Sequence, residues 1–296
     1  MNLYTHKDSN IRKTWLLFTV FLMVVMGFGW FFTQIYNDPG ILYIAVVFSI
    51  GMSITSYWFS DKIVLRMSNA VPVSKENARE LYNVVENLAI TAGLPAPKIY
   101  IINERAPNAF ATGRNPEHAV VAVTTGLLER LDRSELEGVI AHELSHIGNR
   151  DMLVSTVAVI LVGFISIASD FFMRSLWWGR GSRDKNMHPA LLLIGIILAI
   201  LAPIAGTLMR LAISRKRELL ADASGALLTR YPDALASALV KISSDPTPLR
   251  VANNTTAHLW FDDPFDNKPQ KAWFHNLFLT HPPVEERLRN LRGLKI

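Results

Sequence analysis

Two histidines and a glutamate have a spacing that can hold and use a metal ion. His142, Glu143 and His146 lie in the stretch AHELSHIGNRD, and residues four apart on an α-helix differ by only about 40° around its axis. The two imidazoles can therefore bind one zinc ion from one helix face. Glu143 adjoins the first imidazole and can take a proton from a water molecule that the metal activates. The spacing predicts a hydrolytic metal centre, with two solvated histidines on a polar helix as the alternative.

A second stretch offers the remaining ligand. A catalytic zinc ion usually has three protein ligands and one open position, and because the chain has no cysteine the third ligand must be His, Asp or Glu. The stretch SRKRELLADASGALL places Glu218 and Asp222 four residues apart, on one helix face. We expect Glu218 to bind the metal and Asp222 to accept the imidazole N–H of a liganding histidine, first of all His142. An ordinary helix salt-bridged to its neighbouring arginines is the alternative.

The flanking sequence predicts the elements that must position these residues. An amphipathic helix is expected at 74–91, with Gly93 as its C-terminal stop. A capping box that begins at Ser134 predicts the start of the helix that carries the two histidines. Turn residues separate three short apolar runs that we predict to be strands, at 98–103, 109–112 and 119–124.

Long apolar segments place the chain in a membrane. Half of the 296 residues are hydrophobic and 19% are charged. Each apolar segment is close to the roughly 20 residues that cross a bilayer, and tryptophans lie near several of their ends. Four buried helices of a soluble protein are the alternative. The four predicted spans cover about 15–36, 41–59, 153–169 and 190–213.

Basic residues predict the orientation of these spans. Lysines and arginines precede the first span and follow the second, whereas the connector at 37–40 has none, so both flanks are expected in the cytoplasm. The connector between the third and fourth segments is itself basic, so that hairpin either crosses fully or is partly embedded among the other helices. The net charge of +5 is not arranged as a nucleic-acid-binding stripe with interleaved aromatics, which excludes nucleic acid as a partner.

A hairpin returns the chain to the side it left, and this dictates the domain organisation. We expect an N-terminal transmembrane hairpin at 1–60 and a second transmembrane or membrane-embedded hairpin at 153–213. The blocks at 61–152 and 214–296 then share one side of the membrane and form the two halves of a catalytic domain. The first half carries the histidine helix and the second carries the third ligand.

The two metal motifs together resemble those of the glutamate-zincin metalloproteases. The stretches PNAFATGRNPEHAVVAVTTGLL and THPPVEERLRNL, with paired apolar spans before and between the motifs, are similar to the HtpX-type membrane proteases over nearly the whole chain. The resemblance implies an α+β fold, in which a zincin-like domain with a small sheet and active-site helices stands on an anchor of about four transmembrane helices. Leu219 replaces a more usual aromatic residue without touching a ligand.

The same resemblance implies a function. It is that of a zinc-dependent endopeptidase that degrades misfolded or damaged membrane proteins in envelope stress response and quality control, with one Zn²⁺ per chain and Glu143 as general base. The protein would be a multi-pass protein of the bacterial cytoplasmic membrane, with its catalytic domain facing the cytoplasm. Its partners would be membrane-protein substrates, the lipid bilayer and other membrane quality-control proteases.

Four further site residues follow from the resemblance. Asn108 and Ala109 match the edge strand that holds the substrate backbone, where an extended peptide adds a strand. His281 matches a histidine that steadies the tetrahedral oxyanion, and Arg287 would assist it or orient Glu218 or Asp222. A plain turn residue and a charged helix start are the alternatives for these positions. The polar segment at 245–269 predicts a loop, with a flap over the cleft as one hypothesis.

Three other functions fit parts of the sequence. A prenyl-protein processing protease needs a large internal chamber, and four spans are too few to enclose one. A non-catalytic zinc-containing membrane scaffold or chaperone predicts that Glu143 is dispensable. A transporter or channel predicts ionisable residues inside the spans, where only Asp170 and Arg210 occur, both near ends.

Overall fold

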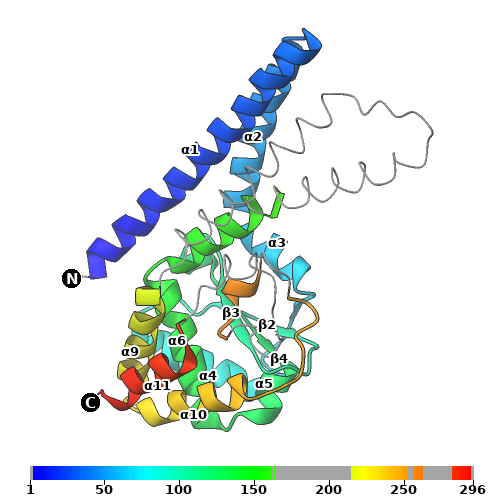
Figure 1. Ribbon diagram of the computed structural model, residues 1–296. Helices are drawn as coiled ribbons and strands as arrows, with labels where there is room; N and C mark the ends of the chain where they lie inside the picture. Colours follow the sequence, from blue (N-terminus) through cyan, green and yellow to red (C-terminus); the bar gives the residue numbers. More distant parts are fainter. Residues whose placement is uncertain (1–2, 162, 165–214, 253–255, 263–281, 295–296) are drawn as a thin grey trace.

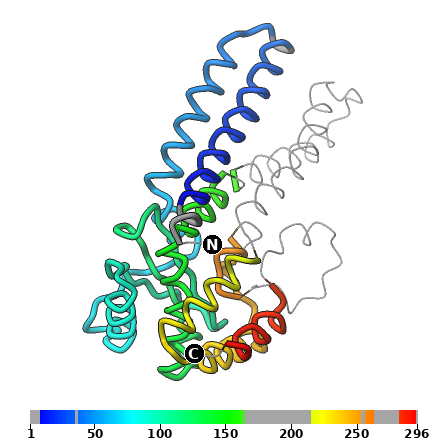
Figure 2. The backbone as a smooth tube through the Cα atoms, turned by 90° about the vertical axis from the view of Figure 1, so that its left-hand side faces the viewer, coloured from blue at the N-terminus to red at the C-terminus, as the bar shows by residue number. Residues whose placement is uncertain are grey.

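The structure is a computed structural model that describes residues 3–161, 163–164, 215–252, 256–262 and 282–294. A long helical hairpin projects from an α+β domain, and its two helices lie side by side in both views (Figure 1, Figure 2). The hairpin is formed by α1 (Leu3–Tyr36) and α2 (Gly40–Trp58), and it places the N-terminal end of α1 near the domain.

The hairpin contains two stretches that are long and apolar enough to cross a membrane, Asp8–Gln34 and Gly40–Trp58. The two helices pack closely at Gly29, where an added Cβ would lie only 2.5 Å from the Cβ of Ala45. Large apolar side chains such as Tyr43 remain exposed on the outside of the pair. These helices correspond to the first two predicted spans.

The third predicted span begins within the described residues, and the fourth lies outside them. The structure has an apolar helix at Asp151–Leu161. Its buried Val154 and Val157 pack against Leu17 and Phe21 of α1. This helix therefore joins the α+β domain to the base of the hairpin.

The sheet has four strands in the order β1-β2-β4-β3. Strand β4 pairs in parallel with β2 and antiparallel with β3, which leaves β3 at an edge. The three predicted strands agree with the observed ones to within one residue at each end, and the two-residue β1 was not predicted. The strands are β1 (Val71–Pro72), β2 (Lys98–Ile102), β3 (Ala109–Thr112) and β4 (Val120–Thr124).

Helices cover both faces of this sheet. On one face, buried side chains of β2 and β4 pack with those of the α4, α6, α9 and α10 helices in a single hydrophobic core that draws on both halves of the chain. On the other face, Phe110 and Ala122 pack with Val64 of α3 and with Trp260. The helices of the domain are α3 (Ser60–Met67), α4 (Arg79–Ala92), α5 (Thr125–Arg130), α6 (Arg133–Gly148), α9 (Arg215–Thr229), α10 (Pro232–Ser243) and α11 (Val284–Arg292), with short 3₁₀ turns at Pro116–His118 and Ala257–Leu259.

Two helix boundaries show how local chemistry fixes the elements. Helix α4 starts five residues later than predicted, and it ends at Gly93, whose φ of 66° is the left-handed conformation that glycine accepts without strain. Helix α6 has a capping box, but the prediction that Ser134 forms it was wrong. The capping residue is Asp132, whose side chain accepts from the Glu135 backbone while the Glu135 carboxylate accepts from the Asp132 backbone.

Candidate metal centre

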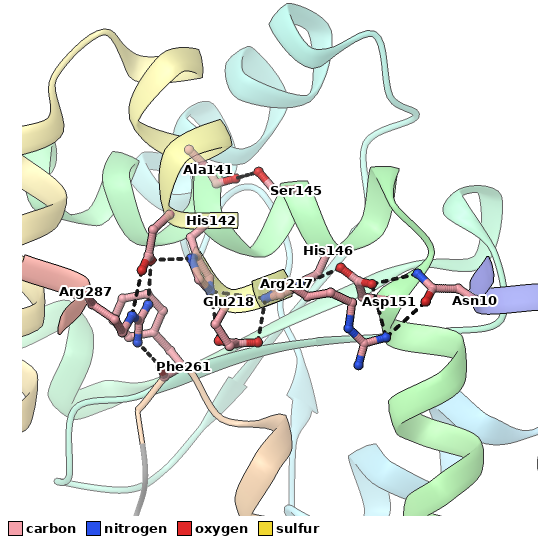
Figure 3. A network of polar contacts seen from close by, with 11 residues as sticks. Asn10, Ala141, His142, Ser145, His146, Asp151, Arg217, Glu218, Phe261 and Arg287 are labelled. Carbon is pink, nitrogen blue, oxygen red and sulfur yellow. Dashed lines mark hydrogen bonds and ion pairs between the residues drawn. The ribbon is translucent and has the colours of Figure 1, made fainter. Parts of the chain in front are cut away.

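The structure brings His142, His146 and Glu218 together, and their ligand atoms all lie within 4.8 Å of one another. The two Nε2 atoms are 3.1 Å apart, and the Glu218 carboxylate oxygens lie 3.5 Å from Nε2 of His146 and 3.8 Å from Nε2 of His142. Ligand atoms around a tetrahedral zinc ion with bonds of about 2.0–2.1 Å are about 3.4 Å apart. The three side chains therefore fit a single metal ion without rearrangement of the backbone (Figure 3).

Close contact between α6 and α9 creates this convergence. A Cβ on Gly225 would lie 2.9 Å from the backbone nitrogen of His142, so only glycine lets α9 approach α6 this closely. Glu218 and Asp222 lie two turns and one turn before Gly225 on α9, and both are buried. Gly225, in the stretch SGALL, therefore has a structural role at the site, and sequence analysis missed this role.

Asp222 connects a proposed ligand to a buried arginine. Its Oδ1 lies 2.9 Å from Nδ1 of His142, which leaves Nε2 of that ring directed toward His146. Arg287 donates to both Asp222 oxygens, at 2.8 and 2.7 Å, and its remaining NH1 group donates to the carbonyl of Phe261 at 2.9 Å. The structure therefore places Arg287 against Asp222, one of the two partners expected for it.

The charges of this pair are strongly coupled. Burial alone would raise the pKa of Asp222, but the Arg287 guanidinium and the hydrogen bond from His142 lower that pKa well below its usual range. Burial would likewise lower the pKa of Arg287, and Asp222 instead raises it above its usual value. Asp222 thus stays ionised and Arg287 stays charged, although both side chains are 1% exposed or less.

Glu143 is buried beside the proposed ligands. It lines the same cavity as His142, His146 and Glu218, a space of about 30 Å³ that is roughly the size of one water molecule. Burial raises the pKa of Glu143 to about 7, helped by the nearby Glu218 and opposed by His146. A carboxylate with such a pKa can exchange protons near neutral pH.

His146 contacts a carboxylate that sequence analysis did not assign. Its Nδ1 lies 3.1 Å from Oδ2 of Asp151, five residues along the chain. Burial would lower the pKa of His146, but Glu218 and Asp151 raise it to about 9. Asp151 is itself bound by Asn10 and Arg217 (Figure 3). The only sequence signal for Asp151 is its position at the end of the histidine motif.

A chain segment lies along the edge of β3. The carbonyl of Ala109 accepts a hydrogen bond from the Phe261 backbone N–H at 2.8 Å. The Asn108 side-chain amide donates to the carbonyl of Asp262 at 3.0 Å and accepts from its N–H at 3.2 Å. The Phe261 ring packs edge-on against His142, with centroids 5.0 Å apart. The edge predicted to hold substrate is thus paired with residues 261–262, which lie within the predicted loop at 245–269, and His281 lies outside the described residues.

Comparison with known proteins identifies the family of the chain. A family model described as peptidase family M48 matches residues 75–295, which contain every residue of the proposed metal set. The chain belongs to peptidase family M48. It is therefore a metalloprotease, and the clustered His-His-Glu group is the candidate for the metal that such a peptidase uses.

Relatives of this M48 peptidase carry the name protease HtpX homolog. The protein from Caldanaerobacter subterraneus subsp. tengcongensis is 47% identical over 301 residues, which cover 99% of this chain and 98% of that protein. Those from Thermoanaerobacter pseudethanolicus and Tropheryma whipplei are 46% and 44% identical, with the same coverage. The crystal structure of S. mikatae Ste24p is similar with a TM-score of 0.49 and 18% identity, covering 93% of this chain and 62% of that one.

Proposed function

We propose that this M48 peptidase uses zinc to hydrolyse peptide bonds of misfolded or damaged membrane proteins at the bacterial cytoplasmic membrane, in envelope quality control. The observation that carries the proposal is the convergence of His142, His146 and Glu218 beside the buried carboxylate of Glu143. Two histidines and one carboxylate suit zinc and leave a coordination position open for water. A closed structural site would instead use all four positions.

Each residue of the site then has a role. A bound zinc ion would polarise the substrate carbonyl and lower the pKa of water. Glu143 accepts the proton of the attacking water and returns it to the leaving amine nitrogen. Asp222 accepts a hydrogen bond from His142 and so holds the ring in one tautomer, while Arg287 keeps Asp222 ionised. His281 remains our candidate for the group that steadies the oxyanion.

The edge of β3 is the proposed substrate site. Asn108 and Ala109 offer an amide side chain and a backbone carbonyl, the groups that pair with an extended peptide. Their present partners, Phe261 and Asp262, are main-chain groups, which supports a site that reads backbone rather than side chains. Such a site suits a quality-control protease, because unfolded chains of any sequence offer the same backbone groups.

The hairpin supports a membrane location. Its two apolar stretches project from the domain as a helical pair (Figure 1). We place the domain on the cytoplasmic side because basic residues flank both ends of the hairpin. Substrates embedded in the same bilayer would reach the site by lateral diffusion, and other membrane quality-control proteases are candidate partners.

The test is cleavage of an unfolded protein by the full-length chain, purified in detergent and supplied with zinc. It is compared with Glu143→Gln protein that is loaded to the same measured zinc content. We expect the wild type to cut and the variant to be slower by about 10²–10⁴-fold, since general-base catalysis contributes that much.

The outcomes separate the hypotheses. Equal zinc content with cleavage by the wild type alone supports a metallopeptidase with Glu143 as base. If both proteins bind zinc and cut at the same rate, Glu143 is not the base. If both bind zinc and neither cuts, the metal has a structural role and the scaffold alternative replaces our proposal.

A further inference from the structure

The strongest new feature is a buried amide that joins the membrane hairpin to the metal centre. Asn10 lies on α1 and is 2% exposed. Its side-chain nitrogen donates to Oδ1 of Asp151 at 2.7 Å and to the carbonyl of Asn149 at 3.0 Å, residues about 140 positions away in sequence. Its oxygen accepts from Arg217 at 3.1 Å. We call Asn10, Asn149, Asp151 and Arg217 the anchor network.

The anchor network ends on His146. The two oxygens of Asp151 have different partners, because Oδ1 faces Asn10 and Arg217 while Oδ2 faces Nδ1 of His146. A histidine whose Nδ1 donates to a carboxylate keeps its Nε2 lone pair available for a metal. That Nε2 is the atom that faces His142 and Glu218. The orientation of Asp151 therefore sets the orientation of His146.

Asn10 is suited to fix this orientation. Both of its amide hydrogens and its oxygen have partners, so the side chain is held from three directions. It is also neutral, and a carboxylate in its place would meet the charge of Asp151 at hydrogen-bond distance. Further along α1, Leu17 and Phe21 pack against the helix that starts at Asp151. Polar and apolar contacts together fix the position of α1 relative to the metal centre.

We infer that Asn10 is a positioning residue of the metal centre, which orients His146 through Asp151 and so makes the first membrane helix part of the site. The inference rests on His146 being a metal ligand, as proposed above. It goes beyond an anchoring role for α1, because an anchor that only holds the domain at a membrane would not change the affinity for metal.

The test measures metal affinity rather than proteolysis. Full-length protein carrying Glu143→Gln, which cannot digest itself if Glu143 is the base, is titrated with zinc in detergent against a chromophoric chelator. Asn10→Ala is added to this background, with Thr19→Val as the matched control. Thr19 is an exposed polar residue on the same helix, and its hydroxyl donates to the carbonyl of Trp15 in α1. Loss of the partner directly behind a ligand weakens metal binding by about 10- to 100-fold. Asn10 lies one residue further out, so we expect Asn10→Ala to weaken zinc binding by about 10-fold, the lower end of that range, and Thr19→Val to leave it unchanged.

A charge exchange separates positioning from folding. Asn10→Asp should weaken zinc binding more than Asn10→Ala, because it opposes the charge of Asp151. Adding Asp151→Asn to Asn10→Asp restores one donor and one acceptor between the two side chains, so the double variant should bind zinc more tightly than Asn10→Asp alone. Equal affinity of Asn10→Ala and the control, or no recovery in the double variant, would overturn the inference. If the parent protein binds no zinc, the proposed function itself fails.

A different observation carries a second inference. In residues 256–262, the covering segment, Phe261 pairs with Ala109 of β3 and Asp262 pairs with Asn108, the residue before β3. Arg287 binds the Phe261 carbonyl, and Trp260 packs on Phe110 with ring centroids 5.0 Å apart. The covering segment also lines the cavity of about 30 Å³ that contains Glu143, which is far too small for a peptide.

The geometry points to the covering segment as an internal occupant of the substrate edge, which must leave β3 before a peptide can bind there. Its main-chain groups make the hydrogen bonds that the proposed substrate would make, so the two compete for Asn108 and Ala109. The inference rests on the proposed substrate site, and it adds that the described state of the enzyme is closed.

Hydrogen exchange tests this without any change to the covering segment. The probe is a peptide that wild-type enzyme has been shown to cut, added at saturation to the zinc-loaded Glu143→Gln protein. We expect amides of residues 256–262 to lose protection on binding, while those of α4 keep theirs. Unchanged or increased protection of the covering segment with bound peptide would refute the inference. Absence of any cut peptide would instead count against the proposed function.

Discussion

Arg287 is a buried charge beside the proposed metal ligands. Its guanidinium is fully buried, binds Asp222 with two hydrogen bonds and lies 4.7 Å from the centre of the Phe261 ring. Such a pair is stable only while both charges are present, since either charge alone would be buried without compensation. The Arg287–Asp222 pair therefore contributes both to the stability of the fold and to the orientation of His142. Mutation can separate these two contributions.

Replacing Arg287 with methionine should destabilise the protein. We expect Arg287→Met to lower the free energy of unfolding by about 3–5 kcal/mol, because it leaves the Asp222 charge buried and unpaired. Denaturant titration of metal-free protein in detergent measures this, with the exposed Arg289→Met on the same helix as control. Adding Asp222→Asn should recover part of the stability without recovering zinc affinity. A loss below about 1 kcal/mol, the range of an exposed pair, would contradict the burial argument.

At this scale, sequence reasoning found the residues that helical spacing relates to one another. His142 with His146, and Glu218 with Asp222, follow from a period of 3.6 residues. Contacts between distant segments were not accessible in this way. Asn10 approaches Asp151 across 141 positions, and neither residue belongs to a spacing pattern that predicts the other.

At the scale of elements, the site depends on how closely α9 approaches α6. The gap at Gly225 is too small for a methyl group, because the nearest atoms belong to the backbone of His142 and cannot rotate away. Sequence analysis predicted both helices but not how they pack. Their close approach depends on the missing side chain at Gly225, which no spacing pattern reveals.

Gly225→Ala tests this approach. Alanine is favoured over glycine in a helix by about 1 kcal/mol, so the variant would be more stable if space allowed. We expect it instead to be less stable by about 1–3 kcal/mol through overpacking, with weaker zinc binding because α9 carries Glu218. Thermal unfolding and zinc titration measure the two effects, with Leu227→Ala on the exposed face of α9 as control. A stabilised variant with unchanged zinc affinity would show that the helices can separate freely.

Removing the metal should loosen the same contact. The proposed ligands lie on both α6 and α9, so a bound zinc ion would stabilise the folded arrangement of the two helices. At a free zinc concentration 100 times the dissociation constant, the expected gain is about 2.7 kcal/mol. Thermal unfolding with and without a chelator measures it, and His146→Ala should abolish the difference. An unchanged midpoint in the wild type would mean that these residues hold no metal in the folded protein.

At the scale of the whole molecule, the sequence predicted an apolar hairpin and a domain made from two separate blocks of the chain. Apolar stretches of about 20 residues are visible in sequence because the bilayer sets their length. The position of the domain relative to the hairpin could not be predicted from the sequence. It depends on the anchor network and on the packing of Leu17 and Phe21, which are contacts between distant parts of the chain.

Cysteine labelling tests the proposed orientation. The chain has no cysteine, so single substitutions can be labelled without background. Asp38→Cys in the connector of the hairpin and Glu76→Cys in the domain both lie at exposed positions. A membrane-impermeant maleimide applied to intact bacterial spheroplasts should label the first and spare the second, which becomes reactive after permeabilisation. The reverse pattern would place the domain outside.

The position of Asn10 has a consequence for the ions that the site meets. Asn10 lies five residues before Trp15, the exposed residue at which the first predicted span begins, so about 7–8 Å of helix axis separates these two residues. A tryptophan at the start of a span is expected at the level of the lipid headgroups, so the anchor network lies within about one Debye length of them. At the membrane surface itself, a potential of about −30 mV concentrates divalent cations roughly tenfold and protons roughly threefold, and this enrichment decays over about one Debye length. The lipid composition of the leaflet would therefore set both the effective metal supply and the local acidity of the catalytic centre.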